Sequence, residues 1–262
     1  MDFDENYLRE QLKGWMIGDP LWVIPEVSST NEWLKDFVRR NSTPSGAMVV
    51  ADYQTSGRGR MWRQWVSPAG TGLLCSFYWI PRLSMSQWAM YSLASALAVY
   101  DLLMIDVLKS EGRKNIRFKW PNDILIGKKK ISGILGETAT VQGIVIGIGL
   151  NVLQQRSQLP NTDTTSVYLW TRNKVNRSEL LVQLVSHLEN RFVQLDQGNI
   201  GAVIDEISAI GPKSGSGIQV KIGSNILLGT YQGLSPQGTL LLKTEDGLVH
   251  DLATADEVRT LK

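Results

Sequence analysis

The sequence predicts an α+β fold, with a mixed β-sheet and flanking helices over residues 1–212 and a small antiparallel β-barrel of SH3-like size over residues 213–262. Two observations support this prediction. The first part alternates between helical and strand patterns, and two of its helices are long. After the Gly/Pro/Ser-rich stretch at 211–217, only short alternating segments separated by turns follow.

Helices are predicted where apolar residues recur at helical spacing. In the first helix, Ser29 and Glu32 have the spacing of a capping box, in which each side chain bonds the backbone N–H of the other residue. Ser84 and Gln87 have the same spacing at the start of the longest helix, whose interior is rich in Ala, Leu and Met. The predicted helices cover residues 27–38, 84–108, 177–196 and 201–210.

Strands are predicted between these helices, where short runs of aliphatic and β-branched residues occur. They cover residues 47–52, 73–80, 116–120, 124–126, 129–137 and 144–150. The run at 73–80 contains the single cysteine, Cys75, which we expect to be a packing residue because one cysteine cannot form an intramolecular disulfide.

The last part of the chain has a different pattern. The runs IQVKI, ILLGTYQG, TLLLK and LVHDL are separated by turn sequences such as GSN and TEDG, which is typical of a small antiparallel barrel. A module of about fifty residues has a thin core of its own. We therefore expect this module to pack against the first part.

The net charge excludes a general nucleic-acid binder. The chain has 27 Lys and Arg residues against 25 Asp and Glu residues, a net charge of +2, so it has no overall basic field. Positive residues are instead clustered at 58–63, 113–119 and 128–130. Local clusters on a nearly neutral protein favour a small anionic ligand.

The chain is expected to be cytoplasmic. Its first residues, MDFDENYLRE, are acidic and polar, unlike the basic and apolar regions of a signal peptide. No stretch approaches the roughly 18–20 apolar residues that span a membrane. The sequence therefore predicts no membrane segment.

The segment SGRGRMWRQW, at 56–65, combines backbone freedom with positive charge. Gly57 and Gly59 weaken any regular structure. Guanidinium groups on such a loop can move toward a phosphate or carboxylate and bind it through several donors. On its own, the segment is equally typical of a solvated surface loop.

Lys119, Asn122 and Asp123 surround a proline turn between two predicted strands. Amide and carboxylate groups placed together in this way can bind Mg²⁺ or a nucleotide. Taken alone, Pro-Asn-Asp is more typical of an ordinary turn, in which the Asx side chains bond their own backbone.

Three further stretches could contact a ligand. Lys130 enters a strand, and Gly133 would allow a ligand to approach closely; the alternative is a polar strand start with a bulge. In GIGLN, Gly149 also permits close packing, and Asn151 ends the strand. The polar stretch at 28–31, SSTN, offers hydroxyl and amide groups to a neutral ligand, although helix capping also explains it.

Common nucleotide, metal and nucleophile signatures are absent from the sequence. It contains neither a GxGxxG fingerprint nor a GxxxxGK[ST] P-loop. His187 and His250 are far apart and have no metal-ligand spacing, and no local signature of a serine or cysteine nucleophile occurs. A nucleotide would therefore bind in another way.

The order of these motifs resembles that of biotin–protein ligase, also named biotin–acetyl-CoA-carboxylase ligase: SSTN, YQTSGRGRMWRQW, FKWPNDILIGKKKISGIL, GIGLN and then a small β module. The resemblance runs from about Val27 to the end of the chain. It implies a class II synthetase-like fold of the biotin/lipoyl ligase type. It also implies that the protein uses biotin, ATP and Mg²⁺.

The resemblance implies a two-step reaction. The carboxylate of biotin attacks the α-phosphate of MgATP, which gives biotinyl-5′-AMP and pyrophosphate. A lysine of the biotin carboxyl carrier protein of acetyl-CoA carboxylase then attacks this mixed anhydride, which gives biotinylated lysine and AMP. Positive groups would offset the repulsion between the carboxylate and the polyphosphate.

Individual roles also follow from the resemblance. Lys130 matches a family lysine near the carboxylate and the α-phosphate, and Lys130 and Arg60 are the expected catalytic residues. Closure of the glycine–arginine loop would exclude water from the adenylate. The residues implied for biotin are Ser29, Thr30, Asn31, Gln54, Gly57, Arg58, Gly59, Arg60, Trp65, Lys130, Gly133 and Gly149. Those implied for the nucleotide are Arg60, Arg63, Trp65, Lys119, Asn122, Asp123, Lys130 and Asn151, with Asp123 also holding Mg²⁺.

Two features depart from the family. Glycine is frequent where this chain has Trp62, which we expect to make the loop stiffer and more apolar. Family members that repress transcription carry an N-terminal helix-turn-helix domain, for which the residues before Val27 leave no room. A ligase without DNA binding is therefore expected, and a hydrophobic sheet edge could support a homodimer.

Two other functions are compatible with the residues. A ligase or transferase for lipoate or octanoate would resemble this family in fold, although KISGIL and GRGRMWRQW argue against it. A non-catalytic protein that senses biotin or a nucleotide, with the β module recruiting a partner, is the second alternative.

Overall fold

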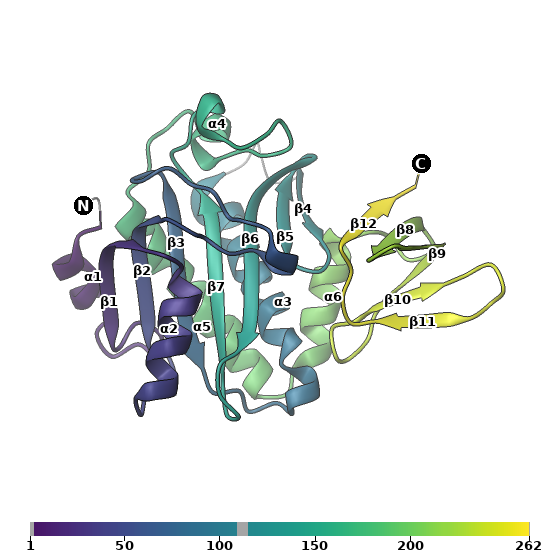
Figure 1. Cartoon of the computed structure of the whole chain (residues 1–262), viewed down its shortest axis with the longest axis horizontal. Helices are drawn as coiled ribbons and strands as arrows, with labels where there is room; N and C mark the ends of the chain where they lie inside the picture. The colour runs from purple at the N-terminus through teal and green to yellow at the C-terminus, as the bar shows by residue number, and fades with distance from the viewer. Residues whose placement is uncertain (1–2, 109–114, 262) are drawn as a thin grey trace.

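The computed structural model describes residues 3–108 and 115–261, so Arg113 and Lys114 of the second basic cluster lie outside the described residues. Within this part of the chain, a seven-stranded mixed sheet is followed by a five-stranded antiparallel sheet (Figure 1). Helices cover both faces of the larger sheet. The predicted α+β fold class is therefore confirmed.

The larger sheet has the strand order β1-β2-β3-β7-β6-β5-β4. Strand β1 pairs with β2 in parallel, and every other neighbouring pair is antiparallel. The strands are β1 (Leu21–Val27), β2 (Met48–Gln54), β3 (Gly72–Trp79), β4 (Ile116–Lys119), β5 (Asp123–Ile126), β6 (Lys129–Thr138) and β7 (Ile144–Asn151).

The helices divide between the two faces of this sheet. Helix α2 (Thr30–Arg40) packs on one face, over β2, β3 and β7. Helices α3 (Ala89–Asp101) and α5 (Arg177–Asp196) pack together on the opposite face (Figure 1). The other α-helices of the described residues are α1 (Glu5–Gln11), α4 (Val167–Thr171) and α6 (Ile200–Ile210).

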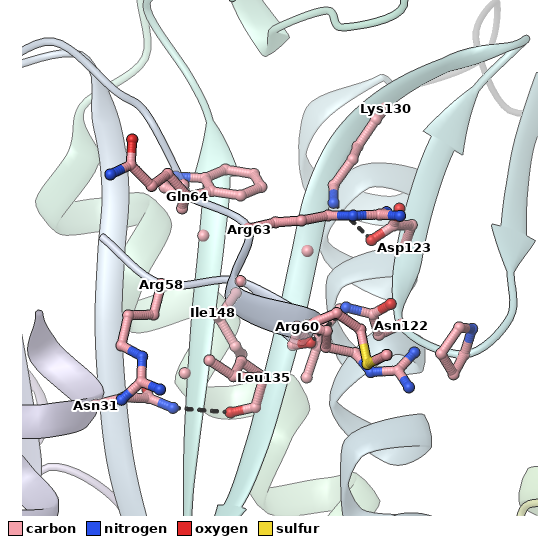
Figure 2. A pocket seen from close by; sticks show the side chains of 18 of the residues that line it. Asn31, Arg58, Arg60, Arg63, Gln64, Asn122, Asp123, Lys130, Leu135 and Ile148 are labelled. Carbon is pink, nitrogen blue, oxygen red and sulfur yellow. Dashed lines mark hydrogen bonds and ion pairs between the residues drawn. The ribbon is translucent and has the colours of Figure 1, made fainter. Parts of the chain in front are cut away.

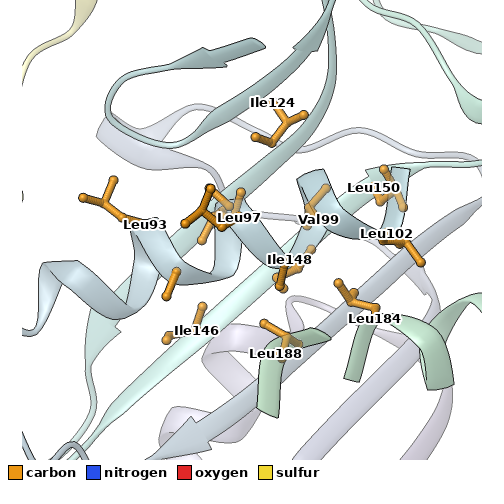
Figure 3. Close-up of a cluster of buried hydrophobic side chains, with 14 of the residues drawn as sticks. Leu93, Leu97, Val99, Leu102, Ile124, Ile146, Ile148, Leu150, Leu184 and Leu188 are labelled. Atoms are coloured by element: carbon orange, nitrogen blue, oxygen red, sulfur yellow. The ribbon is translucent and has the colours of Figure 1, made fainter. Parts of the chain in front are cut away.

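Strand β7 shows how the core and the opposite face are separated. Successive side chains of a strand point to opposite faces, and Ile146, Ile148 and Leu150 point toward α3 and α5 (Figure 3). Gly147 and Gly149 therefore lie on the other face. Burying each large aliphatic side chain stabilises the fold by roughly 1.5–3 kcal/mol. The other members of this cluster, contributed by the helices that cover β7, include Leu93, Leu97, Leu102, Leu184 and Leu188.

The long helix predicted over 84–108 is interrupted. A 3₁₀ turn (Met85–Gln87) precedes α3, and a π-helical segment (Leu102–Val107) follows it. The Ser84 hydroxyl donates to the Gln87 side chain at 3.0 Å and caps no backbone group, so this predicted capping box is wrong. Helix α3 is apolar and buried along most of its length, so packing, and not a cap, decides its position.

The other predicted capping box is also wrong. Ser29 occupies the N-cap position of α2, but its side chain makes no capping bond. Glu32 pairs instead with Lys35 at 2.7 Å and with Arg58 of the glycine–arginine loop. The helix begins at Thr30, because the residues before Ser28 belong to β1.

Strand β1 is not predicted by the sequence pattern because it contains Pro25. Proline removes a ladder donor and is tolerated in an edge strand, and β1 is an edge of the larger sheet. Helices α1 and α4 are also unpredicted, since each is too short to show a helical period.

One segment, residues 85–107, is long and apolar enough to span a membrane, contrary to the prediction from the sequence. Of its most apolar window, 67% is buried inside the protein. The segment is thus the central core helix with its two extensions. Cys75 is buried and free, as expected of a packing residue.

The C-terminal sheet has the order β11-β10-β9-β8-β12. It contacts the first part: the Trp120 indole N–H donates to the carbonyl of Gly238 at 3.1 Å, and β9 touches α6. The expected packing of the module is therefore confirmed. Its strands are β8 (Gly217–Ile222), β9 (Asn225–Leu234), β10 (Leu240–Lys243), β11 (Val249–Leu252) and β12 (Glu257–Thr260), of which β12 was not predicted.

Candidate active site

A cavity of about 160 Å³ lies between the glycine-bearing face of the larger sheet, the glycine–arginine loop (residues 55–71) and the start of β12. Most of the predicted site residues line it, although they come from separate parts of the chain. These residues are Ser29, Thr30, Asn31, Gln54, Arg58, Gly59, Arg60, Arg63, Trp65, Lys119, Asn122, Asp123, Lys130, Gly133 and Gly149.

Two predicted residues, Gly57 and Asn151, lie outside this lining. Asn151 is 3% exposed, and its amide donates to the carbonyl of Thr165 at 2.9 Å. The Gly57 carbonyl accepts the backbone N–H of Trp65 at 2.8 Å and closes the base of the loop. Both residues therefore support the structure beside the cavity.

The lining also includes residues that were not predicted as site residues from the sequence. Most are neighbours of predicted residues within the same motifs, so treating each motif as a whole could have found them. Residues 255–258 gave no such signal because their hydrogen bond with the loop, from Arg63 to Asp256, crosses 193 positions of the chain. The additional lining residues are Met61, Gln64, Trp120, Pro121, Ile134, Leu135, Gly147, Ile148, Ala255, Asp256, Glu257 and Val258.

Glycines let two side chains lie directly on the sheet. A Cβ atom at Gly149 would come within 2.5 Å of the Trp65 ring. A Cβ atom at Gly133 would lie 3.1 Å from both the Trp65 ring and the Nζ of Lys130. Within the described part of the chain, the buried indole N–H of Trp65 has no hydrogen-bond partner. It is therefore available to a ligand.

Lys130 is aimed into the cavity by an irregularity in the β5–β6 ladder. Ile124 pairs with Ser132 and Leu125 with Lys130, so β6 carries one extra residue, as in a bulge. The Nζ of Lys130 lies 2.7 Å from Oδ1 of Asp123 and 5.4 Å from the centre of the Trp65 ring. The ammonium group is thus held between a carboxylate and an aromatic face.

The loop forms a small hairpin whose arginines point in two directions. Figure 2 shows Arg58 extending toward Asn31, whereas Arg60 and Arg63 extend toward the side that holds Asn122 and Asp123. Positive groups therefore face both ends of the cavity.

The tip of the hairpin has an unusual backbone conformation. Met61 and Trp62 have φ angles of 54° and 62°, in the left-handed region that favours glycine. The Trp62 side chain is 89% exposed, and the guanidinium of Arg58 lies 5.5 Å from its ring centre. This conformation explains why glycine suits position 62, and the cation–π contact gives the tryptophan a partner.

Two loop arginines also contact the C-terminal module. Arg60 donates to the Thr254 hydroxyl, and Arg63 donates to the carbonyl of Asp256 at 2.9 Å. Burial lowers the pKa of the Arg60 guanidinium, against the opposing charge of Asp123. The module thereby forms one wall of the cavity and holds the loop.

At the opposite end of the cavity, beside Arg58, the wall is formed by neutral polar groups. Gln54 Oε1 accepts the backbone N–H of Thr30 at 2.8 Å and its hydroxyl at 3.0 Å. Thr30 and Asn31 are at most 4% exposed. Such fixed amide and hydroxyl groups suit a neutral polar ligand.

Two protein-family models match this chain. Residues 23–151 match the biotin/lipoate A/B protein ligase family, and residues 213–256 match the biotin protein ligase C-terminal domain. The biotin–[acetyl-CoA-carboxylase] ligase of Mycobacterium tuberculosis is 31% identical over 247 residues, which cover 91% of this chain and 89% of that protein.

The chain belongs to the biotin protein ligase family. This confirms the family and the enzyme class expected from the motifs. The bifunctional ligase/repressor BirA of Escherichia coli is 30% identical over 245 residues, 92% of this chain and 74% of that protein.

The fold of this ligase also matches solved structures. The biotin protein ligase of Aquifex aeolicus in complex with biotin and ATP superposes with a TM-score of 0.77 and 28% identity, covering 92% of this chain and 99% of that one.

Proposed function

We propose that this ligase activates biotin and transfers it to a protein lysine within the one cavity described above. In the first step, a carboxylate oxygen of biotin bonds to the α-phosphorus of ATP, and the bond to pyrophosphate breaks. In the second step, a lysine amine attacks the acyl carbon of biotinyl-5′-AMP, loses a proton and releases AMP.

The observation that carries this proposal is the division of the cavity into two ends. Neutral polar groups at Thr30, Asn31 and Gln54 suit the ureido ring of biotin, and Arg58 extends toward them. At the other end, the cationic groups of Arg60, Arg63 and Lys130 suit the carboxylate of biotin and the phosphates of ATP. The glycine face and Trp65 lie between the two ends and suit the apolar tail of biotin.

Lys130 is proposed as the central catalytic residue. Its ammonium group would stabilise the charge that develops as the carboxylate approaches the α-phosphate. Arg60 and Arg63 would bind phosphate oxygens, and closure of the loop over them would exclude water from the reactive anhydride. Lys119 and Asn122 would help to hold the nucleotide, while Asn151 would only support the adjoining segment.

A magnesium ion would depend on ATP for most of its ligands. Within the described residues, no group of three or more His, Cys, Asp and Glu side chains is arranged to hold a metal. Mg²⁺ characteristically binds one or two carboxylates together with substrate phosphates. Asp123 lines the cavity and would supply one such carboxylate. Its ion pair with Lys130 would then be replaced by the contact with Mg²⁺.

The acceptor is proposed to be the biotin carboxyl carrier protein of acetyl-CoA carboxylase, in the cytoplasm. The names of the Mycobacterium tuberculosis and Paracoccus denitrificans relatives support that choice of substrate. We further propose residues 1–212 as the catalytic domain and residues 213–262 as a second domain, whose residues 255–258 complete the cavity.

The decisive experiment incubates the ligase with MgATP, a carrier domain and biotin, lipoate or octanoate. We expect modification of one carrier lysine with biotin alone, detected by intact mass and peptide sequencing. A carrier domain with that lysine replaced by arginine is the control. ATP–pyrophosphate exchange that responds to lipoate or octanoate, but not to biotin, would contradict the proposal.

A further inference from the structure

A cluster of four charged residues lies behind the polar end of the cavity. Lys35 of α2 pairs with Glu32 at 2.7 Å and with Glu137 of β6 at 2.8 Å. Glu32 also pairs with Arg58 of the loop. The Lys35 side chain is only 9% exposed, and burying an ammonium group is costly. A hydrophobic contact would hold α2 on the sheet at a lower cost in free energy. Attachment of the helix therefore does not explain why charged residues lie here.

Glu137 reaches from this cluster to Asn31. Its Oε2 accepts a hydrogen bond from Nδ2 of Asn31 at 2.9 Å. Burial alone would raise the pKa of Glu137, but hydrogen bonds from Lys35 and Asn31 and the charges of Lys35 and Arg58 keep it below its usual value. The carboxylate is therefore ionised at neutral pH and can only accept hydrogen bonds.

An acceptor at this place fixes which way the Asn31 amide points. One amide hydrogen bonds Glu137, and the other bonds the carbonyl of Leu135 at 3.0 Å (Figure 2). The Asn31 Oδ1 must then point the opposite way, where it accepts the Ser76 hydroxyl at 2.6 Å.

The same orientation places Oδ1 over the cavity floor. Gly147 lines the cavity, and a Cβ atom built on Gly147 would overlap Oδ1 of Asn31. A carbonyl oxygen has two lone pairs, of which Ser76 uses one. Asn31 thus offers its remaining lone pair, and not an N–H group, to whatever occupies this end of the cavity.

We propose that Glu137, held by Lys35, is a positioning residue that fixes Asn31 as a hydrogen-bond acceptor and thereby makes the site select a ring N–H donor. The inference rests on the proposed placement of the biotin ring at this end of the cavity. A ureido ring has two N–H donors, so Asn31 recognises one of them.

The test compares biotin with its two cyclic carbamate analogues, in each of which one ureido N–H is replaced by oxygen. ATP–pyrophosphate exchange gives KM and kcat for each compound. In the wild-type ligase, the KM for one of the two analogues should be at least roughly tenfold above that for biotin, because two acceptors then face each other.

Glu137→Gln should reduce that ratio to about threefold, because the glutamine amide can either accept or donate, so that only the carbonyl of Leu135 still favours this orientation of the Asn31 amide. The KM for ATP should stay within about twofold of the wild-type value. A merely structural effect would raise both biotin and analogue KM values together and leave the ratio unchanged.

Glu32→Gln is the matched control. It also removes one carboxylate beside Lys35, but the side chain of Glu32 pairs with Lys35 and Arg58, whereas the carboxylate bonded to Asn31 is that of Glu137, so the analogue ratio should stay at the wild-type value. If Glu137→Gln keeps the full ratio, Glu137 does not set the polarity of Asn31. If the wild-type enzyme itself does not distinguish the three compounds, the ring is not bound here, and the placement fails together with the inference.

Discussion

The Nζ of Lys130 lies 2.7 Å from Oδ1 of Asp123, across the β5–β6 ladder. In this position the ammonium group also lies beside Gly133, where any side chain would crowd it. A bulge in β6 and a glycine therefore combine to present one lysine to the cavity. The carboxylate holds the lysine in place, and the ammonium group lies over the Trp65 ring.

Lys130→Ala should lower biotin-dependent ATP–pyrophosphate exchange by at least about a hundredfold, because an electrostatic contact at the reacting phosphate is lost. Circular dichroism and the melting temperature should stay close to wild type. The neighbouring residue supplies the control: Lys129 is exposed and outside the cavity lining, so Lys129→Ala should retain exchange. Unchanged turnover in Lys130→Ala would remove Lys130 from the mechanism.

Arg60→Ala should weaken binding of biotinyl-5′-AMP by roughly tenfold or more and weaken binding of biotin by a smaller factor, because the phosphate is the main expected partner of Arg60. Isothermal calorimetry with both ligands measures the two changes. Thr254→Val removes the contact with the module but keeps the guanidinium, and should have the smaller effect. Equal losses for biotin and the adenylate in Arg60→Ala would contradict the phosphate role.

Arg177→Met should destabilise the protein by about 3–5 kcal/mol, because it leaves a carboxylate without its buried partner. Arg177 is 2% exposed, pairs with Asp52 at 2.5 Å and donates to the carbonyl of Gly72 at 2.9 Å. Urea unfolding followed by tryptophan fluorescence measures the decrease in the free energy of unfolding. Arg259→Ala removes a surface pair and should leave the unfolding midpoint unchanged.

The contribution of Glu137 to stability should depend on pH. Its folded-state pKa lies below the usual 4.5, so this contribution is fully present above pH 4.5 and is lost as the pH falls through the lower folded value. The stability deficit of Glu137→Gln should therefore be largest at neutral pH and shrink in acid. Urea unfolding from pH 7 to pH 3 measures it, with exposed Glu10→Gln as the control. A deficit that does not change with pH would show that the charge is not responsible.

The sequence predicts the composition and place of the glycine–arginine loop, but not its backbone conformation. Alternating glycines and arginines predict a mobile basic segment, and the structure places that segment over the cavity. The sequence did not predict the left-handed backbone at Met61 and Trp62, because neither residue type prefers it. Only the closed hairpin, with Trp65 bonded back to Gly57, imposes that conformation.

By itself, the sequence determined the fold class, the family and most of the residues that line the cavity. Local spacing carries this information, since glycines, apolar periods and motif order report on the backbone and on which face is buried. The tertiary structure alone decided which distant groups meet: Glu137 with Asn31, and Arg63 with Asp256. Such pairs lie 106 and 193 positions apart, and no local pattern encodes them because they form only when separate elements have packed.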